Sequence, residues 1–197
     1  MRSSGSTRNR RPSRPVRLFV VLAGEDHPKA CTGRRLLHRG LARAARSAEG
    51  LSPSPIVLDP YAPEPLGPGD RPTALKAGIL AVDCSWNRLT ERGAFPRDTG
   101  PDARVRRRLP ILIATNPQHY GRPAQLNTVE ALAAALFLIG RPEQSLGLLA
   151  GFRGSDSFLS VNAERLAAYT RERTSVGILA AERRLFGGET GGQSTGG

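Results

Sequence analysis

The chain has 197 residues, enough for one large domain, and 39% of them are hydrophobic. No run of about 18 apolar residues occurs, which excludes an ordinary transmembrane helix, and two cysteines, Cys31 and Cys84, are too few for a disulfide framework. The charged N-terminus is not followed by an apolar segment of signal-peptide type, so we expect a cytoplasmic protein.

The chain is strongly basic, with 29 Lys and Arg residues against 17 Asp and Glu residues and a net charge of +12. Only Lys29 and Lys76 are lysines, so the positive charge comes almost entirely from arginine. The planar guanidinium group suits phosphate, which indicates a nucleic-acid partner. A genome rich in arginine codons would explain the ratio of arginine to lysine but not the net excess.

The composition divides the chain into four parts. Residues 1–15 are basic and contain no acidic residue, which predicts a disordered arm. Residues 16–115 are expected to form an α/β N-terminal domain, and residues 116–186 a helical C-terminal domain. Residues 187–197 are rich in glycine and predict a flexible tail.

Strand and helix patterns alternate in the first half, which predicts a parallel sheet covered on both faces. The longest expected helix has Leu36, Leu37, Leu41 and the pair Ala44–Ala45 on one face. In chain order we expect a strand over 16–23, a helix over 31–47, a strand over 55–60, a strand over 78–84, a short helix over 85–93 and a strand over 109–117.

The second half is predicted to be helical, over 126–140, 142–151, 161–170 and 171–185. Asn127 and Glu130 form a capping-box pattern at the start of the first of these helices, and Thr32 is a second candidate N-cap earlier in the chain. Free backbone N–H groups at such helix starts can hold a carboxylate or a phosphate, although ordinary capping also explains both patterns.

Three polar residues, Asp59, Asp83 and Asn116, follow predicted strands. Ligands of parallel sheets bind beyond the carboxyl ends of the strands, so these residues mark a candidate site. Asp83 could act as a general base or could cap the following helix, and composition alone favours the cap. Trp86, the only tryptophan, is by composition a core residue.

Four arginines cluster immediately before the last predicted strand, at Arg104, Arg106, Arg107 and Arg108. They are candidate phosphate contacts, with a solvated face as the alternative. The histidines match no metal-ligand spacing, and the chain has no phosphate-binding glycine loop, no dinucleotide fingerprint and no C-x-x-C pair. We therefore expect no metal site.

Six blocks of the sequence belong together: HPKACTGRRL (27–36), VLDP (57–60), VDCSW (82–86), RRLPILIATNPQHYGRPAQL (107–126), NTVEA (127–131) and FLSVN (158–162). In this combination the chain resembles the small-subunit (16S/18S) rRNA aminocarboxypropyltransferases. The resemblance extends from about residue 17 to about residue 170, and the blocks occur in the family's order and spacing.

The resemblance implies a fold similar to the SPOUT methyltransferases: an N-terminal half with a parallel sheet and a trefoil knot, an all-helical C-terminal half, and the cofactor between them. It implies an enzyme that moves the 3-amino-3-carboxypropyl group of S-adenosylmethionine to N3 of N1-methylpseudouridine in small-subunit rRNA. The implied partner is this rRNA or a pre-ribosomal subunit, and we expect a monomer that uses neither membrane nor metal.

The resemblance also assigns site residues. Asp83 lies where the family places an aspartate near the transferred carbon, so it is the candidate catalytic residue. The cofactor residues are implied to be Thr32 and Thr128 for the carboxylate, the Val82 carbonyl for the ribose, backbone groups of Leu109 and Ala124 for the adenine, and Leu58, Pro60, Trp86, Leu126 and Ala131 for the apolar walls.

The chain departs from the family pattern at a few positions: Asp59 and His119 replace a common Ser and Asn, and Gly154–Ser155 replaces a Trp-Gly pair. Two other functions are considered. A SPOUT-type RNA methyltransferase shares the fold but transfers a different group. A non-catalytic assembly factor would bind rRNA through arginines in a salt-sensitive way without binding S-adenosylmethionine.

Overall fold

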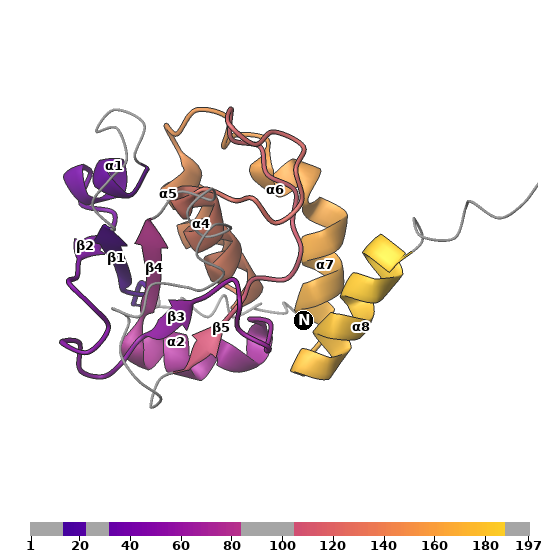
Figure 1. Ribbon diagram of the computed structural model, residues 1–197, viewed down its shortest axis with the longest axis horizontal. Coiled ribbons are helices and arrows are strands. Elements are labelled where there is room, and N and C mark those ends of the chain that lie inside the picture. Colours follow the sequence, from indigo (N-terminus) through magenta and orange to yellow (C-terminus); the bar gives the residue numbers. More distant parts are fainter. Residues whose placement is uncertain (1–13, 23–31, 84–104, 188–197) are drawn as a thin grey trace, which may run out of the picture.

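The computed structural model describes residues 14–22, 32–83 and 105–187, and these form an α/β fold around a parallel sheet (Figure 1). The sheet has five strands in the order β2-β1-β4-β3-β5, and every pair is parallel, as predicted. The strands are β1 Leu18–Leu22, β2 Arg43–Ala44, β3 Ile56–Leu58, β4 Ile79–Asp83 and β5 Arg106–Arg107.

The helices beside the sheet include all four that were predicted in the second half, found here as α4, α5, α7 and α8. In Figure 1, α1 lies beyond the arrowheads of β1 and β4, and α8 lies at the opposite side of the molecule. A wholly helical second half, the trefoil knot and the domain boundaries stay predictions. The helices are α1 Thr32–His38, the 3-10 helix η1 Pro68–Asp70, α2 Arg71–Ala77, α4 Thr128–Leu138, α5 Pro142–Leu149, α6 Phe158–Val161, α7 Ala163–Arg171 and α8 Ser175–Phe186.

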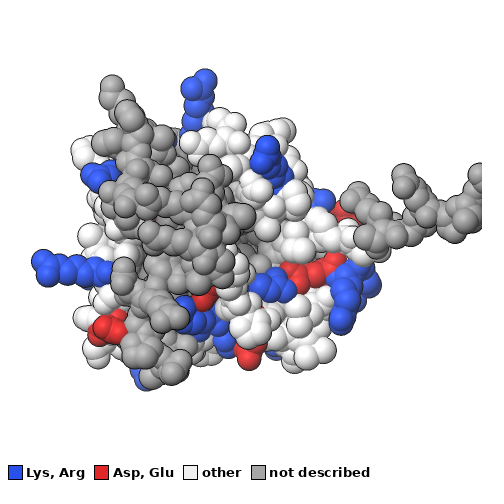
Figure 2. All heavy atoms as spheres, in the orientation of Figure 1, with Lys and Arg blue, Asp and Glu red and all other residues white. Residues whose placement is uncertain are grey.

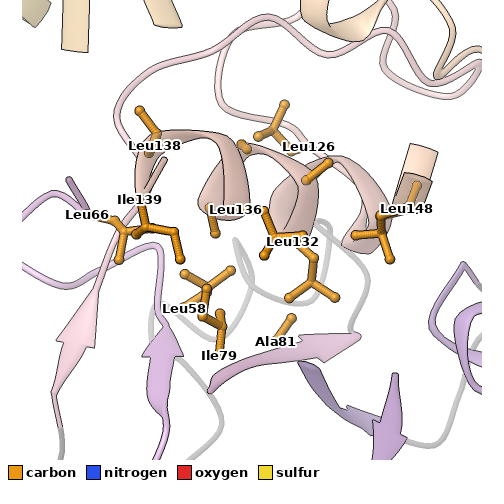
Figure 3. Packing of buried hydrophobic residues seen from close by; sticks show 14 of the residues in the cluster. Leu58, Leu66, Ile79, Ala81, Leu126, Leu132, Leu136, Leu138, Ile139 and Leu148 are labelled. Atoms are coloured by element: carbon orange, nitrogen blue, oxygen red, sulfur yellow. The ribbon is translucent and has the colours of Figure 1, made fainter. Parts of the chain in front are cut away.

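The main core lies between the sheet and α4 (Figure 3). Side chains alternate along each strand, so Ile79 and Ala81 of β4 face the α4 side, whereas Leu80 belongs to a smaller cluster on the other face. On α4, Leu132 and Leu136 are fully buried against this core. Burial of β4 on both faces explains its continuous apolar sequence. Because Asp83 is the last residue of this buried strand, the sheet fixes its position.

The predicted helix over 31–47 is wrong in its second half, because α1 ends at His38. Gly40 adopts a positive φ of 66°, and the Leu41 amide donates to the Leu36 carbonyl at 3.0 Å, which is a helix-ending geometry. The chain then pairs with β1 through β2. Ala44, expected on the apolar helix face, is exposed on this edge strand.

The predicted strand over 109–117 is also wrong, because the strand in this region is β5 and the following segment leaves the sheet. Pro110 has no N–H to donate to a neighbouring strand. Beyond it, side chains of helices or their N-terminal caps bind the backbone of the segment. The amides of Ile111, Ile113 and Thr115 donate to Glu182, Asn162 and Glu130 at 2.8 Å each. The predicted short helix over 85–93 lies outside the described residues.

Candidate active site

Asp83 is the last residue of β4, a strand with neighbours on both sides, and its side chain is buried. One carboxylate oxygen, Oδ2, accepts a hydrogen bond of 3.1 Å from the Gly33 amide in the first turn of α1. The other, Oδ1, accepts from the Thr128 hydroxyl in the first turn of α4. Asp83 therefore connects the carboxyl end of the sheet to the starts of two helices that are far apart in the sequence.

Gly33 is a residue of this arrangement that the sequence reasoning did not single out. A Cβ atom at position 33 would lie 2.5 Å from Oδ2 of Asp83, closer than real Cβ atoms come to a carboxylate. Because glycine has no Cβ, α1 can approach Asp83 closely enough for the backbone hydrogen bond. The signal in the sequence was a glycine inside the first turn of a helix, where glycine is otherwise unfavourable.

Three predicted cofactor residues lie around Asp83. Thr128 bonds to it directly, Val82 precedes it in β4, and Thr32 precedes Gly33 at the start of α1. The fold thus brings together residues from three separate blocks of the sequence at one edge of the sheet. Their roles toward a cofactor stay predictions.

The predicted apolar walls lie mostly in or against the main core. Leu58 and Leu126 are buried members of it, and Ala131 packs against it. Pro60, two residues after β3, is half-buried. The side chain of Leu109, predicted to bind the adenine through its backbone, also packs against the core. Trp86 and Arg104 lie outside the described residues.

The backbone of Ala124 is unusual, because it has a φ of 60° that non-glycine residues rarely adopt. Its amide donates to the Leu112 carbonyl at 2.8 Å. The Leu109 carbonyl accepts from Nη1 of Arg108 at 3.1 Å. A sparsely populated conformation is found often in loops that contact ligands, so Ala124 is a suitable candidate for backbone recognition.

The loop before α4 is held by Glu130, whose side chain is fully buried. Its predicted capping-box pairing with Asn127 is confirmed by two hydrogen bonds of 2.9 Å. The same carboxylate also accepts from the amide and hydroxyl of Thr115, at 2.8 and 2.9 Å, and from the Asn116 side chain at 2.7 Å. The additional bonds were not expected, and they fix the segment that leads from residue 115 to Thr128.

The arginines after residue 105, predicted to contact RNA, all bind acidic side chains of the protein itself. The hydrogen bond with Glu182 is the main reason why the pKa of Arg108 is raised. RNA contact by these arginines stays a prediction, but their structural role is to hold β5 and the segment after it. The pairs are Arg106 with Asp59 at 2.8 Å, Arg107 with Asp70 at 3.0 Å and with Glu64 at 3.1 Å, and Arg108 with Glu182 at 2.6 Å.

The first of these pairs involves Asp59, a position at which the chain departs from the pattern of the family that it resembles. Asp59 is buried, and besides Arg106 it accepts from the Tyr61 amide at 2.9 Å. The carboxylate of Asp59 is therefore paired with an arginine of β5, a strand of the same sheet.

Across the part of the chain that the structure describes, no group of three His, Cys, Asp or Glu side chains is placed to hold a metal ion, and no helix is long and apolar enough to cross a membrane.

The fold and these contacts define a class: parallel α/β proteins, in which ligands bind at the carboxyl edge of the sheet. A family model described as "Ribosome biogenesis protein, C-terminal" matches residues 56–186. The 16S rRNA aminocarboxypropyltransferase of Methanopyrus kandleri is 40% identical over 171 residues, covering 86% of this chain and 98% of that protein. The enzyme of the same name from Vulcanisaeta distributa is 36% identical over 177 residues, covering 87% of this chain and 88% of that protein.

A solved structure is similar as well. The SAM-dependent rRNA:acp-transferase Tsr3 from Vulcanisaeta distributa matches with a TM-score of 0.75 and 35% identity, over 88% of this chain and 90% of that chain. The chain belongs to the 16S rRNA aminocarboxypropyltransferase family. The family predicted from the sequence blocks is therefore confirmed.

Proposed function

We propose that this chain transfers the 3-amino-3-carboxypropyl group of S-adenosylmethionine to a uridine of small-subunit rRNA. Family membership supports both the reaction and the donor, because relatives are named for this transfer to 16S rRNA and a similar solved structure is described as SAM-dependent. The observation in this structure that supports it best is the arrangement around Asp83, which gathers Thr128, Gly33 and the neighbouring Thr32 and Val82 at one edge.

The donor is expected to lie along this edge. Thr32 and Thr128 would hold its carboxylate at the two helix starts, and the Val82 carbonyl would accept from its ribose hydroxyls. The adenine would contact the backbone of Leu109 and Ala124. The apolar positions Leu58, Pro60, Trp86, Leu126 and Ala131 would exclude water from the rest of the donor.

In the reaction, N3 of the uridine attacks the methylene carbon attached to the sulfonium. The new N–C bond forms as the C–S bond breaks, the sulfur leaves as a neutral thioether in methylthioadenosine, and the N3 proton passes to a base or to water. Because the sulfonium is already a good leaving group, alignment of the two substrates supplies most of the rate enhancement. Asp83 would orient the acceptor or remove its N3 proton.

The acceptor that we propose is N1-methylpseudouridine. Small-subunit rRNA with and without the N1-methyl group would be compared as substrates, and the methylated form is expected to react faster. Equal rates on both forms would contradict this choice of acceptor.

We also expect the enzyme to act in the cytoplasm as a monomer.

The transfer itself is tested with donor labelled either in the methyl carbon or in the carboxyl carbon. We expect label from the carboxyl carbon in the rRNA, and mass spectrometry of its nucleosides should show the added group only when the enzyme is present. Label from the methyl carbon alone would instead identify an RNA methyltransferase. RNA binding without any affinity for the donor would identify a non-catalytic assembly factor.

A further inference from the structure

Two groups of arginines in the described part of the chain differ in what they contact. Arg106, Arg107 and Arg108 each form an ion pair with a carboxylate of the protein. The segment 32–46, in contrast, contains arginines and no acidic residue. Among the described residues of this segment, Arg35 and Arg39 contact an aromatic ring and backbone carbonyls, and Arg43 and Arg46 are exposed.

Arg35 on α1 and Arg39, the first residue after it, lie four positions apart and are both held against the ring of Phe152. Their guanidinium carbons lie 4.7 and 5.0 Å from the ring centroid. Arg35 donates to the Gly151 carbonyl at 3.2 Å, and Arg39 to the Ala150 carbonyl at 2.8 Å. These contacts orient both groups without a counter-charge.

Two like charges at this spacing repel each other, and a phosphate shared by both guanidinium groups would relieve the repulsion. Contact with an aromatic face and with carbonyl oxygens leaves other N–H donors of each group for an anion, because arginine has five. The Phe152 ring thus gives the pair a fixed geometry suited to phosphate.

Further arginines extend this region. Arg43 and Arg46 are exposed on and after β2, and Arg153 is exposed next to Phe152. In Figure 2 blue side chains project singly near α1, whereas blue and red ones lie against each other over α7 and α8. We define the basic surface as Arg35, Arg39, Arg43, Arg46 and Arg153.

We propose that the basic surface binds the phosphate backbone of the substrate RNA. The inference rests on the proposed function, since it takes rRNA as the partner, and it assigns that partner a surface other than the paired arginines 106–108. Helix α1 carries Arg35 and also Gly33, which contacts Asp83, and Arg39 follows directly after the helix. Its seven residues span roughly 10 Å, so RNA held on the surface lies beside the candidate site.

The test compares three double variants of the full chain that each remove two positive charges: R35A/R39A, R43A/R46A and, as the matched control, R183A/R184A on α8. Arg183 and Arg184 are exposed like the others but lie on α8, on the opposite side of the molecule, and Arg184 forms an ion pair with Glu172 at 3.4 Å. Binding of a small-subunit rRNA hairpin is measured against salt concentration, and donor affinity is measured separately. R43A/R46A removes side chains without a packing role, so it reports on the surface even if R35A/R39A disturbs α1.

We expect R35A/R39A and R43A/R46A to weaken RNA binding by roughly tenfold, and to reduce the slope of log affinity against log salt by about 1.5. The α8 control should change neither quantity. If R43A/R46A binds RNA like the wild type, or if all three variants lose equal affinity, the proposal is wrong. Wild-type RNA binding without any group transfer would contradict the proposed function while leaving the surface intact.

Discussion

The carboxylate of Asp83 accepts hydrogen bonds from the starts of two helices, and it is also the candidate catalytic group. The Gly33 amide and the Thr128 hydroxyl occupy one oxygen each. Because each carboxylate oxygen can accept two hydrogen bonds, these two contacts do not by themselves prevent Asp83 from taking a proton.

The first prediction concerns Asp83→Asn. Asparagine has nearly the same shape, so the fold should persist, but it cannot take a proton as a carboxylate does. We expect transfer of the carboxyl-labelled group to fall by about 100-fold, the lower range for general acid–base catalysis, with donor affinity within a few fold of the wild type. Full turnover with normal donor affinity would show that Asp83 is not the base, and thermal unfolding controls for misfolding.

The second prediction compares two glycines. Gly33→Ala places a methyl group 2.5 Å from Oδ2 of Asp83, so either α1 or the carboxylate must move. We expect donor affinity to fall at least about tenfold and stability to fall by about 1–3 kcal/mol. Gly147→Ala in α5 is the control, because its Cβ meets nothing within 4 Å. It should raise stability by about 0.5–1 kcal/mol and leave donor affinity unchanged.

Isothermal titration with the donor and urea unfolding would measure both variants. Unchanged donor affinity in Gly33→Ala would mean that the approach of α1 to Asp83 is not needed for binding. Loss of affinity in both variants would show that the effect is not specific to position 33.

Several residues that lie around Asp83 were named from the sequence, whereas Gly33 and the contacts among them were not. Thr32 and Asn127 were recognised as polar residues at helix starts, and the Asn127–Glu130 capping box was confirmed. The bond between Thr128 and Asp83 joins residues 45 positions apart. Such a contact depends on how β4 and α4 pack, which local pattern does not encode.

At the scale of elements, the segment after β5 shows why a correct apolar pattern led to a wrong strand. Its run of apolar residues is what a central strand requires, but Leu112 and Ala114 are buried whereas Ile111 and Ile113 are only partly buried. In the structure its hydrogen-bond partners are side chains: Asn162 both accepts from the Ile113 amide at 2.8 Å and donates to the Ile113 carbonyl at 2.9 Å. Side chains of helices thus replace a neighbouring strand, and a pattern of hydrophobicity cannot distinguish the two environments.

The third prediction concerns Tyr169, which donates to the carbonyl of Ile111 in this segment at 2.9 Å. Burial, and secondarily the charge of Glu182, raise the pKa of the Tyr169 hydroxyl above its usual value of about 10. A raised pKa means that the folded state holds this proton more tightly than the unfolded state does. The resulting stability is complete below pH about 10 and is lost as the pH rises further.

We therefore expect the free energy of unfolding to decrease above pH about 10, by at most about 1.4 kcal/mol per pH unit from this group. Tyr169→Phe should be less stable at neutral pH by about 1 kcal/mol, because it loses one hydrogen bond, and its alkaline decrease should be shallower. Urea unfolding between pH 8 and about 11 measures both curves. Parallel curves would show that Tyr169 does not titrate at higher pH in the folded state.

At the scale of the whole molecule, net charge indicated nucleic acid but did not locate its binding surface. The run at 104–108 was the most conspicuous basic cluster in the sequence, yet its described arginines are bound to Asp59, Asp70, Glu64 and Glu182. The arginines of α1 and β2 are more scattered in the sequence and have no acid among them. Charge counting treats both groups alike, because it does not include the acids that folding brings near.

The fourth prediction separates these two groups with one variant from each. Arg108→Ala leaves the buried carboxylate of Glu182 without the bidentate partner that now holds it at 2.8 and 2.6 Å. Removing one member of a buried pair is costly because the remaining charge stays desolvated, so we expect a loss on the order of 3 kcal/mol. Arg46→Ala, on the exposed basic surface, should change stability by less than about 0.5 kcal/mol.

For RNA binding we expect the reverse of the effects on stability: the larger change in Arg46→Ala and the smaller one in Arg108→Ala. Arg46→Ala should reduce the salt slope of hairpin binding by about 0.7–0.9, as expected for one lost phosphate contact, whereas folded Arg108→Ala should keep the wild-type slope. Urea unfolding and salt titration on the same preparations measure both quantities. A reduced slope in Arg108→Ala with normal stability would place its guanidinium on the RNA instead of on Glu182. Such a result would return the RNA contact to the cluster that the sequence first suggested.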